Sequence, residues 1–383
     1  MLKYIIISCI LFALVACQNR EQLQLPTATT DLASIPIEEA SQIWPVLSSL
    51  GAPQGLRACC AFGYNIRAEI SGVPVPFYLI DNIVEANKLG EHHYNDSYLA
   101  ATADIVGLNS EKVGLVYTTD GGFIDIAHVR DTADYTLYLF SQIYPNLGKE
   151  WTLKLSDELA SRQIHFNSFT PPESAVERYT LSTYLAAKLA FQLAAWHEIA
   201  QWYGYQSVPG FSEGVSAFSP EDLYSNLLGA RLASSLILQG RAESLAIFSH
   251  SLETILPVAL NELGAFNKEK TREVFDRVDG IWWDSSKRVP NKFLLLTRDY
   301  DVADSRYPFL PTQTIPHKGL KLSLPDEYAG YSLAKLAQFR LVPTDKMAQL
   351  PVPEKYWTID DFSTLAEQAK IEDQKQQTRT LKK

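Results

Sequence analysis

The sequence predicts an α+β fold, a largely helical single domain with a small β-rich part near its N-terminus. Three observations lead to this prediction. Apolar residues recur at helical spacing through most of residues 123–278, short runs of β-type residues precede that region, and no linker rich in Gly, Pro or Ser divides the middle of the chain. With 383 residues, the chain is long enough to enclose a large hydrophobic core.

Four runs of β-type residues are expected to form strands, at residues 60–70, 73–80, 113–118 and 293–297. Ser71-Gly72 supplies a turn between the first two. Pro74 and Pro76 lack the backbone N–H that a central strand donates, so the second run is expected at a sheet edge. The third run ends at the turn sequence Asp120-Gly121-Gly122.

Five segments have the apolar spacing of helices, at residues 123–143, 173–203, 219–238, 242–263 and 270–278. Gly204 lies where a glycine would end the second helix. The third segment has a strong start signal, with Ser219 as the N-cap, Pro220 at the first helical position and Glu221-Asp222 in the first turn. The middle of the domain is therefore expected to be helical.

The N-terminus has the pattern of a bacterial lipoprotein signal. Lys3 precedes the apolar run Tyr4–Ala13, which is too short for a membrane-spanning helix, and Leu14-Val15-Ala16-Cys17 has the form of a lipobox. We expect residues 1–16 to be removed as a signal peptide and Cys17 to carry lipid such as palmitate. An uncut signal-anchor helix is the alternative.

This signal implies a domain plan and a location. Residues 17–38 are polar and would form a flexible tether, residues 39–367 a single globular domain, and residues 368–383 a disordered polar tail. In Gram-negative bacteria an Asp directly after the lipidated Cys tends to hold a lipoprotein in the inner membrane. Gln18 therefore favours the outer membrane, with the domain facing the periplasm.

Composition narrows the range of partners. The net charge of −10 argues against nucleic acid, because phosphate binding needs clustered Lys and Arg. It also argues against attachment of the folded surface to anionic lipid, so the membrane would be reached through the lipid on Cys17. The 7 Trp and 19 Tyr can fill a core or line a groove for sugars or peptides. A protein or small-molecule partner is left open.

Cys59 and Cys60 are the cysteines that remain after Cys9 leaves with the signal and Cys17 is lipidated. The periplasm is oxidising, yet neighbouring residues in a strand point to opposite faces, so a bond between them needs a strained turn. A vicinal disulfide, two buried thiols or an intermolecular link are the options. A catalytic thiol is disfavoured, because no nearby feature marks a base.

His197-Glu198 in the second predicted helix matches half of a zinc-protease motif. That motif places a second His four residues after the first, on the same helix face, while the Glu polarises a metal-bound water. Gln201 occupies the second position here, so a zinc ion would need ligands from elsewhere. His197 is thus a candidate metal ligand and catalytic group, and Glu198 a candidate general base. The alternative is a structural His paired with a neighbouring acid.

A second candidate lies in the first predicted helix, where Asp125, His128 and Asp131 follow at three-residue steps. An acid one turn from a His can orient the imidazole and fix its tautomer. That arrangement suits a metal site, or a base with its orienting acid in a hydrolase. Alternatively, Asp125 only complements the helix dipole, and Arg130 pairs with Asp134 on the surface.

Two weaker candidates lie in loops. His92 and His93 are adjacent, and adjacent His side chains rarely bind one ion together, so at most one would be a metal ligand. A solvated polar loop is the alternative. Glu213 follows the His197 helix after a short loop and can fold back as a further metal ligand, or it can be an ordinary loop acid.

Several segments taken together resemble a family of uncharacterised bacterial lipoproteins that share domain of unknown function 4056. They are Arg57–Gly63, Gly122–Asp131, Trp196–Glu198 with Trp202–Gly204, and Phe218–Tyr224. The resemblance spans roughly residues 50–240 and implies a bacterial envelope lipoprotein. It implies no activity, so the candidate site residues depend on their own chemistry.

Two functions are compatible with these observations. We favour a non-catalytic envelope lipoprotein that binds a partner or ligand and has structural histidines. The alternative is a metal-dependent hydrolase, with zinc as its cofactor, that acts on periplasmic peptide, peptidoglycan or lipid fragments through His128, His197 and Glu198. Asp125 would then orient a His, and Glu213 would complete the metal shell. Phosphate-binding Gly-rich loops, dinucleotide fingerprints and Gly-x-Ser-x-Gly elbows are absent from the sequence.

Overall fold

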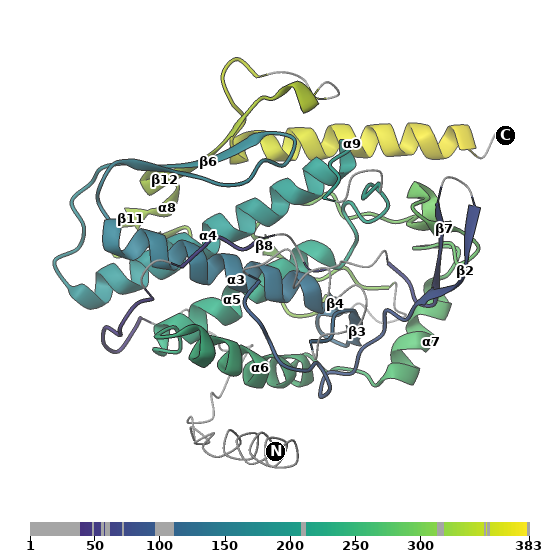
Figure 1. The fold of residues 1–383 in the computed structure, drawn as a ribbon, viewed down its shortest axis with the longest axis horizontal. Coiled ribbons are helices and arrows are strands. Elements are labelled where there is room, and N and C mark those ends of the chain that lie inside the picture. Colours follow the sequence, from purple (N-terminus) through teal and green to yellow (C-terminus); the bar gives the residue numbers. More distant parts are fainter. Residues whose placement is uncertain are drawn as a thin grey trace, which may run out of the picture.

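Three long helices, α3 (Ile126–Ile143), α4 (Ala175–Trp202) and α5 (Asp222–Leu238), form the centre of the molecule and contact one another in all three pairs (Figure 1). Nearly all residues of α5, and of α4 after its first turn, are buried. Both sequences are apolar around the whole helix, as is typical of a helix enclosed in a core.

The computed structural model describes residues 39–47, 50–54, 57, 62–70, 73–95, 111–207, 212–311, 318–347, 350 and 353–380. The predicted signal peptide and tether, with Cys17, lie outside the described residues, and so do Cys59 and Cys60. Within the described part of the chain, no helix combines the length and the apolar character needed to span a bilayer.

Further helices and small sheets surround the centre. Helix α6 (Leu245–Glu262) packs on α5, α7 (Lys268–Val278) on strand β3 (Leu115–Thr118), and α9 (Ile359–Thr380) on α4. The shorter elements are η1 (Tyr144–Asn146), η2 (Lys292–Leu294), η3 (Asp345–Met347), α8 (Leu333–Leu336), β8 (Ser305–Arg306), β9 (Leu322–Ser323), β10 (Glu327–Tyr328) and β11 (Tyr331–Ser332). The predicted α+β class is confirmed.

Two three-stranded sheets lie at the periphery. In the first, β1 (Ile66–Ile70) pairs antiparallel with β2 (Val73–Ile80) and parallel with β7 (Arg288–Val289), which puts β2 at the edge. This is the edge position that the two prolines predict. In the second, β6 (Ser161–Phe166) lies between β5 (Trp151–Lys154) and β12 (Ala337–Val342). Alternate residues of β6 are buried, which turns Arg162 toward the helices.

The first central helix begins three residues later than the sequence predicts. Residues 122–125 instead form β4 (Gly122–Asp125), which pairs antiparallel with β3 (Leu115–Thr118). Asp125 ends this strand and caps α3, because its carboxylate accepts the backbone N–H of Ala127 at 2.7 Å and of His128 at 3.4 Å. The cap fixes His128 in the first turn of α3.

Helix α5 begins at Asp222, so Ser219 is not its N-cap. The Ser219 hydroxyl instead donates to the Glu221 carboxylate, at 2.7 and 2.8 Å, and Glu221 occupies the N-cap position. Asp222 is then the first residue of the helix, where the partial positive charge of the helix end favours a carboxylate.

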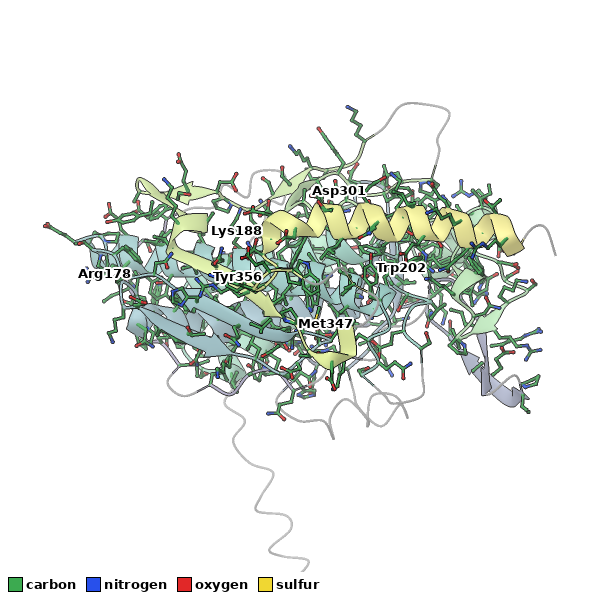
Figure 2. All side chains as sticks on the ribbon, turned by 90° about the horizontal axis from the view of Figure 1, so that it is seen from above. Arg178, Lys188, Trp202, Asp301, Met347 and Tyr356 are labelled. Carbon is green, nitrogen blue, oxygen red and sulfur yellow. The ribbon has the colours of Figure 1, made fainter. Side chains whose placement is uncertain are left out.

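The C-terminal segment also differs from the prediction. Residues 368–380, expected in a disordered tail, continue α9, which lies along the length of the body (Figure 2). Ala369 and Asp373 are buried, and the Gln377 side chain donates to the carbonyl of Leu296 at 3.3 Å. Docking on the body therefore stabilises a segment that is too polar to fold alone.

The strand predicted at 293–297 is replaced by the short turn η2.

A buried ion-pair network ties the N-terminal segment to α3. Arg57 binds Glu111 at 2.9 Å, Asp131 at 2.6 Å and Asp134 at 3.0 Å, and His92 lies 3.0 Å from Asp134. His92 therefore belongs to a network in which cations and carboxylates alternate, which is a structural role. It is neither a solvated loop residue nor part of a convergent metal-ligand group.

Gly229 allows α5 to approach α3 closely. A Cβ atom at this position would lie within 3.0 Å of the Val129 carbonyl group on α3. Because that group is helical backbone, it cannot move aside as a side chain would. The contact sets the distance between the two helices whose first turns carry His128 and Asp222.

We predict that Gly229→Ala destabilises the protein by about 1–3 kcal/mol, because the added methyl group overpacks the α3–α5 contact. Helix propensity alone predicts the opposite sign, a gain of about 1 kcal/mol. Urea unfolding monitored by circular dichroism measures the difference. Gly214→Ala is the matched control, since its Cβ would meet other atoms only at 3.6 Å, an ordinary contact distance. A stabilised Gly229→Ala variant would contradict the prediction.

Candidate metal centre and adjoining cavity

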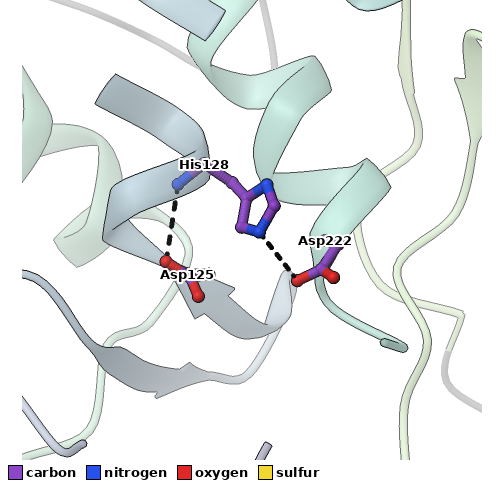
Figure 3. A group of neighbouring side chains, drawn as sticks. All are labelled: Asp125, His128 and Asp222. Atoms are coloured by element: carbon purple, nitrogen blue, oxygen red, sulfur yellow. Dashed lines mark hydrogen bonds and ion pairs between the residues drawn. The ribbon is translucent and has the colours of Figure 1, made fainter. Parts of the chain in front are cut away.

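The first turns of α3 and α5 meet the last part of α4 at one buried point. His128 comes from α3, Glu198 from α4 and Asp222 from α5. In Figure 3 the ring of His128 points to Asp222, with its Nε2 3.3 Å from Oδ1, while its backbone N–H is bonded to Asp125. Packing of the three helices thus assembles a site from residues far apart in the sequence.

Four buried carboxyl groups gather here, each at most 3% exposed: Asp125, Glu198, Glu221 and Asp222. We call them the carboxyl cluster. Glu198 Oε2 accepts the backbone N–H of Phe218 at 2.7 Å, whereas no N–H group of the described residues reaches its second oxygen. The carboxyl group of Asp222 meets the His128 ring and the carboxyl group of Glu198, with which it can hydrogen-bond when one of the two acids is protonated. Within the described residues, no Arg or Lys forms an ion pair with Glu198, Glu221 or Asp222.

Arg298 is a buried cation near the carboxyl cluster, and it interacts through space with Glu198 and Asp222. Its hydrogen bonds, however, go to backbone carbonyls, those of Val215, Ala217 and Lys292. When ionised, Glu198, Glu221 and Asp222 therefore hold more negative charge than the ion pairs of the described residues neutralise. Buried carboxylates in that position either take up protons or bind a cation.

The pKa values of the cluster reflect this excess of charge. Burial raises the pKa of Asp222 well above its usual range, and the neighbouring Glu198 and Glu221 raise it further. Burial also raises the pKa of Glu221 to about 8, with contributions from Asp125 and Glu198. The pKa of Glu198 is likewise raised by burial. Protons thus occupy part of the cluster at neutral pH unless a metal ion replaces them.

Three side chains of the site can bind one metal ion together. One ligand atom each of Asp125, His128 and Asp222 lies within 4.8 Å of the other two. Zn²⁺ binds such nitrogen and oxygen atoms at about 2.0–2.2 Å, and catalytic zinc sites take three protein ligands and a water. A small closing movement would bring the three atoms to these distances.

Asn226, one turn after Asp222, orients the His128 ring. Its amide lies 3.2 Å from His128 Nδ1 and accepts the hydroxyl of Thr132 at 2.6 Å. The amide nitrogen faces Nδ1; if the amide is turned by 180°, its oxygen accepts Nδ1–H, its NH2 donates to the Thr132 hydroxyl, and Nε2 keeps its lone pair for a metal. The ring orientation is therefore supported from outside the ligand set.

His197 faces a different carboxylate. Its Nδ1 lies 3.4 Å from Glu158, which is also bound by Arg162 at 2.8 Å. Burial alone would lower the pKa of His197, but the neighbouring carboxylates, Glu158 foremost, outweigh burial and raise the pKa to about 9. At neutral pH His197 is thus a cation, and a protonated imidazole is a poor metal ligand.

Glu213 closes the loop after α4. Its carboxylate accepts the backbone N–H and the hydroxyl of Ser207, and the amide of Gln201 donates to it at 3.4 Å. Neither Glu213 nor His197 belongs to the convergent group of Asp125, His128 and Asp222. As metal ligands, both therefore lack support from the geometry.

A cavity of about 40 Å³ lies between α3 and α4 beside the carboxyl cluster, with room for about three water molecules. Both candidate histidines line it. The other wall residues are Arg57, Ala127, Asp131, Thr132, Tyr135, Glu158, Arg162, Ala190, Leu193, Ala194 and Asn226. The cavity is thus where a small molecule can meet His128 and His197 together.

The sequence candidates are divided between these two neighbouring places. Asp125, His128 and Glu198 meet at the carboxyl cluster, whereas His197 belongs to the cavity. Asp222 was explained as a helix-start acid, and its second role was missed. The spacing Asp222-x-x-x-Asn226, which puts both side chains on one helix face, is the signal that would have found it.

We predict that the stabilising effect of the His197–Glu158 pair depends on pH. The pKa of His197 is higher in the folded protein, about 9, than in the unfolded chain, about 6.5. Its contribution is therefore complete below pH 6.5 and lost as the pH rises through 9. The charged groups around His197 are Glu158, Glu198 and Glu213, with Arg162 beyond Glu158.

Urea unfolding of the wild type and of His197→Gln at pH 6.5 and 9.5 tests this. The difference in unfolding free energy should shrink between the two pH values by roughly 2–3 kcal/mol. His250→Gln, which changes an exposed His, is the control and should show no such change. A pH-independent difference for His197→Gln would contradict the assignment.

Comparison with known proteins places the chain in a family without assigning a function. No curated protein and no solved structure matches it. The family model described as "Protein of unknown function (DUF4056)" matches residues 47–312, a range that includes the carboxyl cluster, the His128 and His197 positions and Glu213. The chain therefore belongs to the DUF4056 family.

Proposed function

We propose that this protein is a metal-dependent hydrolase, with zinc as its cofactor. One observation carries the proposal: potential ligand atoms of Asp125, His128 and Asp222 converge in a carboxyl cluster where, within the described residues, no Arg or Lys forms an ion pair with Glu198, Glu221 or Asp222. Burying such a cluster is costly, and a divalent cation would remove much of that cost. Peptide, peptidoglycan or lipid fragments of the periplasm are the proposed range of substrates.

Glu198 is the proposed general base. A bound divalent ion would lower the pKa of a coordinated water. The carboxylate of Glu198, close to Asp222 and with a pKa raised by burial, suits acceptance of a proton from that water. The hydroxide would then add to the carbonyl or phosphoryl centre, and Glu198 would pass its proton to the leaving group as the bond breaks.

A non-catalytic binding domain is the second proposal, and the small cavity favours it. A volume of about 40 Å³ holds a few atoms and not a peptide or a sugar ring. If the protein is a non-catalytic binding domain, we expect it to bind a metal or a ligand without converting any substrate to product. Product release from zinc-loaded protein, measured with peptide, ester and phosphoester substrates, separates the two proposals.

We predict that the wild type binds one zinc ion per chain, and that His128→Ala and Asp222→Asn each weaken zinc binding about 100-fold or more. Each change removes one of three protein ligands. Isothermal titration of chelator-treated protein measures the affinity. At a free zinc concentration of 100 times Kd, the wild type should also gain about 2.7 kcal/mol of stability.

Two controls accompany the zinc experiment. His250→Ala removes an exposed His and should bind zinc as the wild type does. In the metal-free state, Asp222→Asn should be at least as stable as the wild type, because an amide in this buried site needs no proton to be neutral, whereas burial and the neighbouring acids disfavour the carboxylate. A wild type without bound zinc, or variants with unchanged affinity, would overturn the metal site.

The proposed location is the bacterial cell envelope, with the domain anchored by lipid on Cys17 in the outer membrane and facing the periplasm. The lipobox pattern supports this proposal. Lipid attached to one terminus binds a membrane because each buried methylene contributes about 0.8 kcal/mol.

We predict that Cys17→Ser moves the protein from the membrane fraction to the soluble fraction, since a hydroxyl in place of the thiol cannot be lipidated by the thiol-directed route. Fractionation of cells that express either form, followed by immunoblotting, measures the shift. Ser8→Ala, a change within the predicted signal that leaves the lipobox intact, is the control. Continued membrane association of Cys17→Ser would show that another feature is the anchor.

A further inference from the structure

We propose that Arg298 is a positioning residue for Glu198, which it holds through the peptide group between Ala217 and Phe218. The proposal rests on the proposed function in one respect, since Glu198 is the proposed general base. Arg298 donates to the carbonyl of Ala217, and the N–H of Phe218, in the same peptide group, donates to Glu198 Oε2 at 2.7 Å. A buried guanidinium and a buried carboxylate are thus joined by one peptide unit.

The peptide unit carries the influence of the cation to the carboxylate. A peptide group is planar and trans, so holding its carbonyl oxygen also fixes the direction of its N–H. A cation at the carbonyl draws electron density from the amide and makes the N–H a stronger donor, and hydrogen bonds in such a chain strengthen one another. Both ends of this chain are charge-assisted hydrogen bonds, which are stronger than neutral ones. Arg298 therefore sets both the direction and the strength of the bond to Glu198.

Arg298 is itself firmly held. Its fork of N–H donors also binds the carbonyl of Val215 at 3.3 Å and that of Lys292 at 2.8 Å. Its guanidinium carbon lies 5.3 Å from the centre of the Trp202 ring, a cation–π contact. Trp202 follows Glu198 by one turn of α4. The guanidinium thus connects the turn at residues 214–218 to η2 and to the helix that carries Glu198.

The backbone of Phe218 is held in an uncommon conformation at this point. Its φ is +58°, in the left-handed region, which a bulky residue adopts only where its surroundings impose it. The carbonyl of Phe218 accepts the backbone N–H of Asp299 at 2.9 Å, and its ring centre lies 4.8 Å from that of Tyr300. The three successive residues 298–300 therefore hold the donor of the bond to Glu198 in place.

This support leaves one oxygen of Glu198 available. Oε2 is anchored by Phe218, whereas no N–H group of the described residues reaches Oε1. The same carboxyl group meets that of Asp222, a proposed metal ligand. A general base must lie within hydrogen-bond reach of the proton that it accepts. Fixing one oxygen of Glu198 would keep the other directed to a water on the metal.

The amide proton resonance of Phe218 in the metal-free protein tests the proposal, because a hydrogen bond to a carboxylate moves an amide proton downfield. Labelling Ala carbonyls with ¹³C and Phe amides with ¹⁵N selects the Ala-Phe peptide groups, at residues 61–62, 190–191, 217–218 and 265–266. Glu198→Gln removes the carboxylate and sets the reference position. In Arg298→Met the Phe218 signal should move most of the way to that reference, while the other Ala-Phe signals stay in place.

Two further variants make the result specific. Arg298→Lys keeps the charge but cannot bind three carbonyls with one rigid fork, so its Phe218 signal should lie between those of the wild type and Arg298→Met. Arg231→Met is the matched control, since Arg231 is as buried as Arg298 and also donates to a backbone carbonyl, that of Ser323. It should leave the Phe218 signal unchanged. An unchanged Phe218 signal in Arg298→Met, or in Arg298→Lys if the Met variant does not fold, would overturn the proposal.

Zinc-loaded protein separates this proposal from the hydrolase function. Arg298→Met should bind zinc at least as tightly as the wild type, because it removes a cation that acts through space on Asp222. Its kcat for the ester or phosphoester that the wild type hydrolyses should fall about tenfold or more with little change in KM, as expected when a general base is displaced. A wild type without zinc binding or turnover contradicts the hydrolase function, and the Phe218 signal then still decides whether Arg298 holds Glu198.

Discussion

Negative charge held at the junction of three helices is the constraint on which the site depends. The first turns of α3 and α5 point to the same place, and each helix start carries partial positive charge that favours carboxylates. Asp125 uses this directly as the cap of α3. Helix ends supply only fractional charge, however, so they cannot balance the four acids of the carboxyl cluster. The remaining charge is what a proton or a metal ion would neutralise.

Direct contacts with cations distinguish a second buried polar group, the network around Arg57, from this cluster. Around Arg57, three carboxylates, those of Glu111, Asp131 and Asp134, each contact the guanidinium directly, and that network joins the N-terminal segment to α3. Around Asp222, the carboxyl groups face one another; His128 lies 3.3 Å from Asp222, and Arg298 acts on the cluster through space without an ion pair among the described residues. Two buried clusters of similar composition thus have different roles, and the pairing pattern, not the residue types, distinguishes them.

The fold class, the central helices and part of the site could be predicted from the sequence. Helical periodicity and capping depend on residues close together in the chain, so they can be recognised without knowing the tertiary structure. Sequence reasoning placed Asp125 and His128 together because they lie within one turn of each other. Contacts over long distances were beyond it: Glu158 lies 39 residues before His197, and no spacing rule links them. Asp222 was hidden for another reason. An acid in the first turn of a helix is already explained by the helix dipole, and the sequence cannot show that the same side chain has a second contact.

The His197-Glu198 pair illustrates why a familiar dipeptide can mislead. Successive residues of an α-helix point about 100° apart, so His197 and Glu198 cannot both face one ion unless the helix axis passes directly beside it. In this structure Glu198 turns to the carboxyl cluster and His197 to Glu158. With Gln201 in place of a second His, α4 offers no ligand pair of its own. The ligands would come from α3 and α5 instead, so metal affinity would depend on how closely those two helices pack. A change that moves α3 away from α5 would therefore lower the stability of the fold and the affinity for the metal together.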